Sequence, residues 1–374
     1  MTRVYLDWNA TTPPLPAVID AMSEAARANW GNPASVHADG RTARACVESA
    51  REAVAQLARC DPRDVVFTSG GTEANNLALR SAFASSSGVL VTSRIEHPSV
   101  VRVAEALERE GRARVRWLRV HPEGTVDLED LTRACADGSV RLVAVQAVNS
   151  ETGVLQPLRE VIRLARQAGA ATHVDTVQAF GRSDDVAEEA DTRAIAAHKM
   201  RGPKAVGALA TRPEVALAPV LLGGSQERGL RPGTVDPVAA AGFAVAARHG
   251  FRSPPRWREL SGLRAVLEEG LLRLAPRARV NGLGAPRAPH VTSVAFPGWE
   301  ASELVAAFDL EGIAVSGGSA CSAGTMEASS VLAAMGDDEA ATCSVRFSLG
   351  EDTTERDIDS ALAAAARVLR RSSF

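Results

Sequence analysis

A short apolar segment, Val65-Val66-Phe67-Thr68, leads directly into Ser69-Gly70-Gly71-Thr72, and a helix is predicted from Glu73 onward. The apolar residues are typical of a buried strand, and paired glycines allow a sharp turn between a strand and a helix. Backbone amides at such a helix start, together with the Thr72 hydroxyl, can bind an anion. The segment fits neither GxxxxGK[ST] nor GxGxxG, so a nucleotide is disfavoured. An ordinary glycine turn explains the pattern equally well.

Strands and helices alternate on both sides of this turn, between about residues 40 and 250. Helical spacing of apolar residues predicts helices over residues 42–59, 98–110 and 158–168. Short apolar runs predict further strands over residues 89–92, 115–118, 142–148, 171–175 and 205–211. Buried strands that alternate with helices form mostly parallel sheets covered on both faces. We therefore predict an α/β fold with a mostly parallel central sheet.

The pattern changes after a helix predicted over residues 238–249, where Ser253-Pro254-Pro255 is interpreted as a break. Beyond it we predict helices over residues 257–274, 302–310 and 354–370, and strands over 291–296 and 343–348. This mixture is typical of a smaller α+β domain. We predict a large domain of residues 15–252 and a small domain of residues 1–14 and 253–374. Whether the N-terminal segment supplies a strand to the small domain is left open by the sequence.

The length and composition are those of a globular protein of roughly two domains. Of the 374 residues, 45% are hydrophobic and 23% are charged, and the net charge of −3 provides no positive field for nucleic acid or an anionic membrane. No apolar run reaches the roughly 18 residues that span a bilayer. The N-terminus lacks the apolar core of a secretory signal. Five cysteines without CxxC spacing argue against disulfides and zinc, so we predict no metal site and a cytoplasmic setting.

Lysine is almost absent from the chain. Lysine and arginine total 42, yet only Lys199 and Lys204 are lysines. A lysine that remains where arginine stands nearly everywhere else is a candidate for a role that needs an amine. Arginine stays protonated, whereas a lysine amine can form a Schiff base. The alternative is chance together with an ordinary surface pair.

Asp175 ends the predicted strand at residues 171–175, and one short strand segment at residues 192–197 separates it from Lys199. Ligands commonly bind at the carboxyl ends of parallel strands. A Schiff-base lysine and an acid that binds a pyridinium nitrogen are what a pyridoxal phosphate site requires. Asp175 also suits a helix N-cap, which is the structural alternative. His97 follows a strand and precedes Pro98, a position that fits a catalytic or a structural histidine.

Cys321 differs from the other cysteines because it lies in a loop of small residues, 316–324 (SGGSACSAG). Such a loop can present a thiol to a ligand, and reactive thiols are exposed whereas structural ones are buried. The other cysteines are interpreted as small core residues in helices (Cys46, Cys60 and Cys135) and as a strand residue (Cys343). Cys321 is therefore the candidate reactive thiol.

Ten motifs occur in one order along nearly the whole chain. They are residues 5–13 (YLDWNATTP), 31–37 (GNPASVH), 69–75 (SGGTEAN), 96–97 (EH), 149–153 (NSETG), 173–178 (HVDTVQ), 198–199 (HK), 227–234 (ERGLRPGT), 318–321 (GSAC) and 346–348 (RFS). Together they resemble the cysteine desulfurases of the NifS/IscS type, which are class V aminotransferases with the fold-type I architecture of pyridoxal phosphate enzymes. The GSAC motif resembles the long-loop group that serves iron–sulfur cluster and thio-cofactor assembly.

The resemblance implies a cofactor, pyridoxal 5′-phosphate, and assigns residues to its ring. Lys199 would bind the cofactor covalently as a Schiff base, and Asp175 would pair with the pyridine nitrogen. Gln178 would reach the ring hydroxyl, and His97 would stack on the ring and move protons. Ser150 would also contact the cofactor, but it stands where the family usually has an asparagine that touches the ring hydroxyl.

The resemblance also assigns residues to the cofactor's phosphate. Gly71, Thr72 and His198 would hold it, and Thr234 would join them from the partner subunit of a homodimer. Ala196 departs from the family pattern, because a serine that binds the phosphate usually stands there.

The reaction implied is conversion of L-cysteine to L-alanine, with the sulfur transferred to Cys321 as a persulfide. Arg346 would bind the substrate carboxylate through two parallel hydrogen bonds. The sulfur would pass to an acceptor protein, a scaffold or sulfur carrier, for iron–sulfur cluster, thio-cofactor or tRNA sulfur supply. One alternative is another reaction of the family, by a selenocysteine lyase or an aminotransferase, in which Cys321 is incidental. A second is a non-catalytic scaffold for sulfur carriers, which would not need Lys199.

Overall fold

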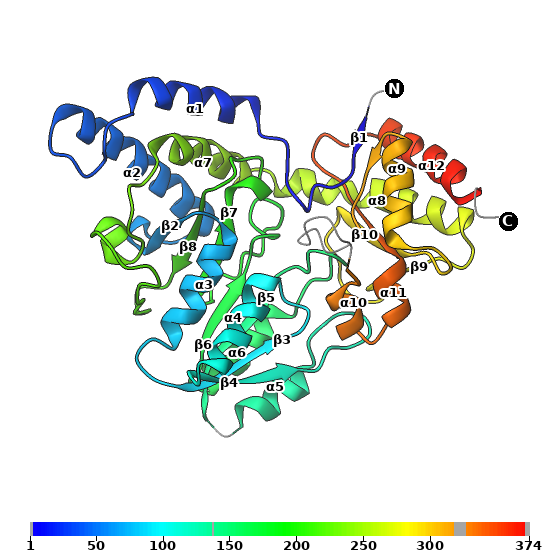
Figure 1. The fold of residues 1–374 in the computed structure, drawn as a ribbon, viewed down its shortest axis with the longest axis horizontal. Helices are drawn as coiled ribbons and strands as arrows, with labels where there is room; N and C mark the ends of the chain where they lie inside the picture. Colours follow the sequence, from blue (N-terminus) through cyan, green and yellow to red (C-terminus); the bar gives the residue numbers. More distant parts are fainter. Residues whose placement is uncertain (1–2, 137, 318–326, 371–374) are drawn as a thin grey trace.

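The computed structural model describes residues 3–136, 138–317 and 327–370 (Figure 1). Its largest sheet has seven strands in the order β2-β8-β7-β6-β5-β3-β4. Their bounds are β2 Val65–Thr68, β3 Gly88–Ser93, β4 Ala113–Leu118, β5 Val140–Gln146, β6 Ala171–Asp175, β7 Thr192–Ala196 and β8 Gly207–Thr211. Within this sheet β8 alone runs in the direction opposite to the other strands. The predicted mostly parallel sheet is confirmed.

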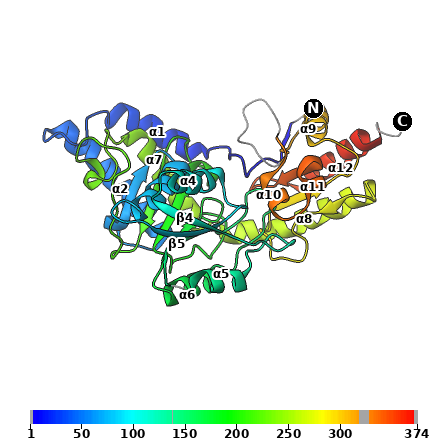
Figure 2. The ribbon, with the colours of Figure 1, turned by 60° about the horizontal axis from the view of Figure 1, so that its bottom comes forward.

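Helices cover both faces of this sheet because successive strand residues point to opposite sides. Leu90 packs in a core cluster with α3 and α4, whereas its neighbours Val89 and Val91 pack in another with α5 and α6. Figure 2 shows α4 on one side of β4 and β5, and α5 and α6 on the other. Near β2 and β8, the face opposite α3 is covered by α2 and α7, and α1 packs on α7. The bounds are α1 Pro16–Ala28, α2 Ala38–Ala58, α3 Gly71–Ala82, α4 Pro98–Arg109, α5 Leu128–Cys135, α6 Leu158–Gln167 and α7 Pro237–Gly250.

The C-terminal part is built around a three-stranded antiparallel sheet, β12-β10-β9, and a two-stranded parallel pair, β1-β11. Figure 1 shows β1, at the N-terminus, beside the C-terminal helices. Residues 4 and 5 therefore supply a strand to this part, which settles the point that the sequence left open. The bounds are β1 Val4–Tyr5, α8 Pro254–Leu274, β9 Arg279–Val280, β10 Val291–Ala295, α9 Ala301–Leu310, β11 Ile313–Ala314, α10 Ser330–Ala334, α11 Asp338–Cys343, β12 Ser344–Ser348 and α12 Glu355–Arg370. The proposed domain limits, 15–252 against 1–14 and 253–374, stay a prediction.

Three local predictions were wrong. The predicted break between two helices exists, but it lies at residues 251–253, and Pro254 itself begins α8, because a proline fits the first turn of a helix, where its missing amide has no intrahelical partner. Cys343 is the last residue of α11, and the strand begins one residue later at Ser344. Cys60 lies just beyond α2, which ends at Ala58, since Arg59 adopts the left-handed conformation that ends a helix.

Two helices are long enough to be considered as membrane-spanning segments. α2 and α8 have 21 residues each, and both carry several arginines and glutamates. Within the described residues, no helix is both long enough and apolar enough to cross a bilayer.

The turn at Gln226–Gly229 is fastened to the central sheet by a buried ion pair. Arg51 of α2 and Glu227 are only 6% and 8% exposed, and two hydrogen bonds of 2.6 and 2.8 Å join their side chains. Glu227 also accepts a hydrogen bond of 2.8 Å from the backbone amide of Phe67 in β2. Arg51 also contacts Glu48, whose side chain is 53% exposed. Glu227 thus links one helix and one strand to the ERGLRPGT segment.

Replacing Glu227 should therefore destabilise the protein far more than replacing Glu48. Glu227→Ala leaves a buried guanidinium and a buried amide without their shared acceptor, so we expect a loss of about 3–5 kcal/mol in the free energy of unfolding. Glu48→Ala removes the exposed partner of the same arginine and should cost less than about 1 kcal/mol. Urea unfolding at one fixed protein concentration measures both. Equal losses would contradict this account of the turn.

Candidate functional site

A cavity of about 390 Å³ lies at the carboxyl ends of three neighbouring parallel strands. Gln146, Asp175 and Ala196, the last residues of β5, β6 and β7, line it, and the first turn of α3 forms another wall. The N-terminal segment and β12 contribute further wall residues. Nine of the residues singled out from the sequence line this one cavity: Gly71, Thr72, His97, Ser150, Asp175, Gln178, His198, Lys199 and Arg346.

Lys199 follows β7 in a short 3₁₀ turn, Ala197–Lys199, and its amine lies in the cavity wall. The amine donates hydrogen bonds to the backbone carbonyls of Asn9 and Ala10. Burial first, and then the positive charges of Arg182 and Arg346, lower the pKa of Lys199 to about 7. A large share of this amine is therefore neutral at physiological pH, which is the form that acts as a nucleophile or base.

Asp175 is held in a fixed orientation at the end of β6. One carboxylate oxygen accepts a hydrogen bond from the Val177 amide (3.0 Å), and the other accepts one from the Asn75 side chain (2.8 Å). The Asn75 carbonyl oxygen lies 2.9 Å from Nε2 of His173, whose pKa burial lowers to about 4. A neutral His173 donates from Nε2 to Asn75, so its Nδ1 accepts from the Thr192 hydroxyl at 2.9 Å. This chain of hydrogen bonds sets the direction of the Asp175 carboxylate.

His97 is tied to the same asparagine. Asn75 donates a hydrogen bond of 2.8 Å to the Ser99 hydroxyl, so that hydroxyl is free to donate to Nδ1 of His97, 2.7 Å away. The Ser99 amide donates to the same nitrogen at 3.1 Å. Nδ1 therefore accepts, and the proton of the neutral ring is on Nε2. Burial lowers the pKa of His97, which favours this neutral form.

The N-terminus of α3 gives the cavity an end suited to an anion. Gly71 and Thr72 are its first residues, and a Cβ added to Gly71 would meet Cγ2 of Val177 at 2.5 Å, so only glycine fits here. His198 faces the same space, with its Nδ1 3.1 Å from the Thr11 hydroxyl. Burial lowers the pKa of His198 to about 4, so it is a neutral hydrogen-bonding group. Backbone amides at the helix start and these side chains can together bind a phosphate.

Arg346 approaches the cavity from β12 and is only 2% exposed. Its guanidinium donates to the Asp7 carboxylate at 2.6 Å and to the backbone carbonyl of Ser150 at 3.0 Å. Arg346 also exchanges two backbone hydrogen bonds with Ser316. At Ser316, the described chain that leads toward Cys321 thus pairs with Arg346, a residue of the cavity wall. Cys321 itself lies outside the described residues.

Thr234 is the one described residue that the sequence assigned to the cofactor and that does not line this cavity. It lies exposed between Gly233 and α7. The sequence reasoning also missed three residues that organise the site, Asn9, Asn75 and Arg182. Asn9 and Asn75 stand in two of the ten motifs, residues 5–13 and 69–75, but no role was assigned to them; Asn75 also stands four residues after Gly71 and so shares its helix face.

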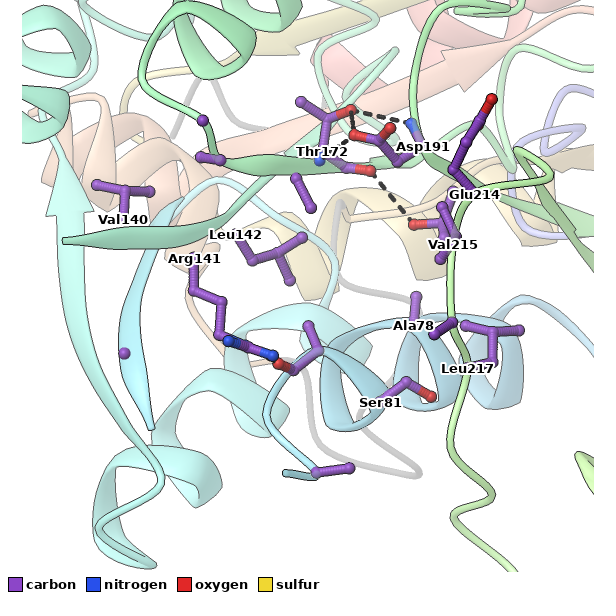
Figure 3. A pocket seen from close by; sticks show the side chains of 18 of the residues that line it. Ala78, Ser81, Val140, Arg141, Leu142, Thr172, Asp191, Glu214, Val215 and Leu217 are labelled. Atoms are coloured by element: carbon purple, nitrogen blue, oxygen red, sulfur yellow. Dashed lines mark hydrogen bonds between the residues drawn. The ribbon is translucent and has the colours of Figure 1, made fainter. Parts of the chain in front are cut away.

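A larger cavity, of about 880 Å³, lies at the opposite, amino ends of the central strands. Figure 3 shows its lining, in which Asp191 is hydrogen-bonded to Thr172. The Ser81 hydroxyl in the same wall donates to the backbone carbonyl of Ala218. Its polar groups serve the fold, and ligands of parallel α/β sheets bind at the carboxyl ends of the strands. We therefore take the smaller cavity as the functional site.

The chain matches the family described as "Aminotransferase class-V" over residues 4–361. It is 41% identical, over 386 aligned residues, to a cysteine desulfurase of Frankia sp., covering 98% of this chain and 91% of that protein. Among solved structures it is similar to a NifS-like protein, with 32% identity and a TM-score of 0.91 over 99% of this chain and all of the other. It is also similar to SspA in complex with cysteine, with 29% identity and a TM-score of 0.81 over 93% and 99% of the two chains. The predicted fold-type I architecture is confirmed.

Asn75 should be essential to the order of the site, whereas its neighbour Asn76 should not. Asn75→Ala removes one buried hydrogen-bond partner from each of Asp175, His173 and Ser99, and we expect about 2–3 kcal/mol of lost stability. Asn76→Ala removes only a bond to the backbone carbonyl of Thr72 at the exposed surface of the same helix and should change stability by about 0.5 kcal/mol or less. Thermal and urea unfolding of both variants measure the difference. A loss as small for Asn75→Ala as for Asn76→Ala would refute the hydrogen-bond chain.

Proposed function

We propose, from the premise that the chain belongs to the class V aminotransferase family, that it is a pyridoxal 5′-phosphate-dependent cysteine desulfurase. It converts L-cysteine to L-alanine and transfers the sulfur to Cys321. The observation that carries this proposal is the pairing, in one cavity, of a buried amine with a lowered pKa and an oriented carboxylate. A ring that bears an aldehyde and a basic nitrogen is the ligand that uses both groups.

The cavity fits pyridoxal 5′-phosphate in size and polarity. A volume of about 390 Å³ lies within the usual range of small-molecule sites. Asp175 would pair with the ring nitrogen, and Gln178 and Ser150 would lie near the ring hydroxyl. The N-terminus of α3, with Gly71, Thr72 and His198, would hold the phosphate. Glycine at position 71 lets the first turn of α3 pack closely against Val177, which holds the backbone amides of this turn at the cavity.

When bound, the cofactor supplies an electron sink for the charge left on the substrate when its Cα proton is removed. The protein's own groups bind and move that proton. Nζ of Lys199, neutral in part near pH 7, is the base that accepts it. His97 also lines the cavity, and its Nε2–H can donate a proton. Arg346 would bind the substrate carboxylate, with Asp7 holding the guanidinium in place until substrate arrives.

The sulfur step involves the Cys321 thiol. Its thiolate attacks the substrate sulfur, the carbon–sulfur bond breaks, and the carbon takes a proton, so that L-cysteine and a thiol yield L-alanine and a persulfide. The atoms balance without an outside oxidant. The persulfide sulfur then passes to an acceptor protein for iron–sulfur cluster or thio-cofactor assembly.

Two departures from the family pattern bear on how tightly the cofactor is held. The Ala196 Cβ would lie 3.7 Å from a Cβ built on Gly71, so this methyl group stands where a hydroxyl would reach the phosphate. Ser150 lines the cavity with a shorter side chain than the usual asparagine. Both changes shorten or remove a hydrogen-bonding group, so we infer weaker cofactor retention than in relatives with the usual pair.

The enzyme would act as a homodimer in the cytoplasm. Thr234, exposed on its own subunit, would reach the phosphate in the partner's cavity. Large apolar side chains that a subunit interface would cover are exposed on α1, after it, and in the loop before Thr234: Ile19, Trp30, Val36, Leu221 and Leu222. Free thiols at Cys46, Cys60 and Cys343 suit a reducing compartment.

Lys199 and Lys204 provide a matched test of the proposed activity. The protein, supplied with pyridoxal 5′-phosphate, cysteine and a thiol reductant, should release alanine and sulfide. Lys199→Ala should lower alanine formation by about 10²–10⁴-fold, the usual contribution of a general base. Lys204→Ala, at an exposed position, should keep the activity. If Lys204→Ala abolished alanine formation and Lys199→Ala did not, the assignment would be wrong.

Cys321 separates a desulfurase from the other reactions of the family. Cys321→Ala should still bind cysteine, seen as a change in the visible spectrum of the cofactor-loaded protein, but should form no alanine above background. Cys343→Ala serves as the control, because Cys343 packs in a buried cluster at the end of α11. Mass spectrometry of the wild-type protein treated with cysteine should find an extra sulfur on the peptide that contains Cys321. Full alanine production by Cys321→Ala, or a persulfide on Cys343, would exclude the mechanism.

A further inference from the structure

Arg182 is a buried cation that lies directly behind Lys199. It stands in the turn after β6 and is 3% exposed. Within the described residues no carboxylate accepts a hydrogen bond from it, since its acceptors are carbonyl oxygens, side-chain amides and a histidine ring. A buried arginine without a carboxylate is costly, because burial disfavours its charge. A residue that is kept at this cost is expected to contribute to the site.

The guanidinium of Arg182 holds three separate parts of the site. Two of its nitrogens donate to the backbone carbonyl of Lys199, at 2.8 and 3.2 Å. A third donates to the side chains of Asn9 (2.8 Å) and Gln178 (2.6 Å). Asn9 in turn accepts, at its backbone carbonyl, from the Lys199 amine and from the Gln178 amide. One planar group thus fixes the lysine's backbone, the residue that receives its amine, and a cavity-lining amide.

The turn is shaped to bring Arg182 this close. Gly181 has a positive φ of 75°, and a Cβ there would meet Cβ of Met200 at 2.9 Å. The Ser253 hydroxyl donates to the Gly181 carbonyl at 2.6 Å, which anchors the turn to the start of α8. On its other side, Arg182 lies 4.8 Å from the centre of the Trp257 ring. Packing on both sides therefore holds the guanidinium in place.

We propose that Arg182 is a positioning residue: its guanidinium fixes the backbone of Lys199 together with Asn9 and Gln178, and it places a buried positive charge close to the Lys199 amine. The inference rests on the proposed function only for the use to which that amine is put. Arginine suits this task because it offers a rigid fork of five donors and retains its proton.

Arg182 is the charged group that acts most strongly on the Lys199 amine. The groups that face this amine are Arg182 and Arg346, which disfavour its proton, and Asp7 and Asp175, which favour it. His97 and His198 also border it, and burial lowers the pKa of each, so neither adds a full charge at neutral pH. Arg346 is paired with Asp7, whereas Arg182 has no carboxylate partner in the described chain. The Glu351 carboxylate favours the charge of Arg182 but, among the described residues, forms no ion pair with it, so this charge still acts on the amine.

The test measures the Lys199 amine itself. The full-length chain, freed of any bound aldehyde with hydroxylamine, is labelled with trinitrobenzenesulfonate across a pH series. Peptide mass spectrometry reads each site, and the chain has only one other lysine, Lys204, which serves as the internal reference. Wild-type Lys199 should label with a midpoint near pH 7. Arg182→Gln should move that midpoint up by about one pH unit, so that labelling at pH 7 falls about fivefold relative to Lys204.

Two further variants separate charge from fold. Arg182→Lys keeps the charge but loses the fork, so the midpoint should move by less than about half a unit. Arg193→Gln is the matched control, because Arg193 is also buried, at 2% exposure, and donates to backbone carbonyls far from Lys199. It should leave the midpoint in place. An unchanged midpoint in Arg182→Gln, or an equal shift in Arg193→Gln, would overturn the proposal.

If Arg182→Gln does not fold, amide hydrogen exchange of the Arg182→Lys variant tests the positioning role instead. Loss of the fork should speed amide exchange of residues 197–202 several-fold, with α8 unchanged, and equal exchange in both proteins would reject the positioning role. Neither measurement needs cofactor or cysteine. A protein that forms no alanine therefore contradicts the proposed function alone, and an unshifted midpoint contradicts this inference alone.

Discussion

The polar contacts of Asn9 hold the cavity together across parts of the chain that are far apart in sequence. Its amide donates to the Ser348 hydroxyl at 3.0 Å, and its side chain donates to the Ser150 carbonyl at the same distance. Its side-chain oxygen accepts from Arg182, and its backbone carbonyl accepts from Lys199. The N-terminal segment must therefore be packed between the central sheet and β12 before the site exists. The site is a product of the complete fold and not of any one motif.

Burial then decides which groups near the cavity carry charge. It lowers the pKa of His173 and His198 to about 4 and raises that of Glu96, which is tied to the Ser93 hydroxyl, to about 8. All three are therefore neutral for the most part at physiological pH. A neutral histidine has one donor and one acceptor nitrogen, so its hydrogen bonds have a fixed direction. The oriented bonds around Asp175 follow from this loss of charge.

The sequence was sufficient for the strand–turn–helix unit at residues 65–75 because each of its parts depends on local chemistry. The strand at Val65–Thr68 and the strand at Ala171–Asp175 lie where the apolar runs predicted them. Pro254 was misread because a proline both stops a helix and begins one, and the choice depends on what precedes it. Local pattern cannot decide between the two.

The site was predicted unevenly for a related reason. Residues whose side chains do the chemistry, such as Lys199 and Asp175, follow strands directly and stand out by type. Asn9 and Arg182 support them through contacts with partners that lie 190 and 17 residues away in the chain, so no spacing reveals them. Asn75 shows the same limit, because it meets Asp175 only after α3 has packed on the sheet.

Two neighbouring cations, Arg182 and Lys199, show why lysine and arginine are not interchangeable in this site. Burial lowers the pKa of Arg182 only to about 9, so the guanidinium stays charged at neutral pH. The same burial takes the Lys199 amine to about 7, where it gives up its proton readily. An arginine at 199 would stay charged and could not act as an amine, and a lysine at 182 could not reach the Lys199 carbonyl, Asn9 and Gln178 with one planar group. Arginine binds its proton more tightly than lysine does. Arg182 therefore stays charged whereas Lys199 can lose its proton, and neither residue can take the other's place.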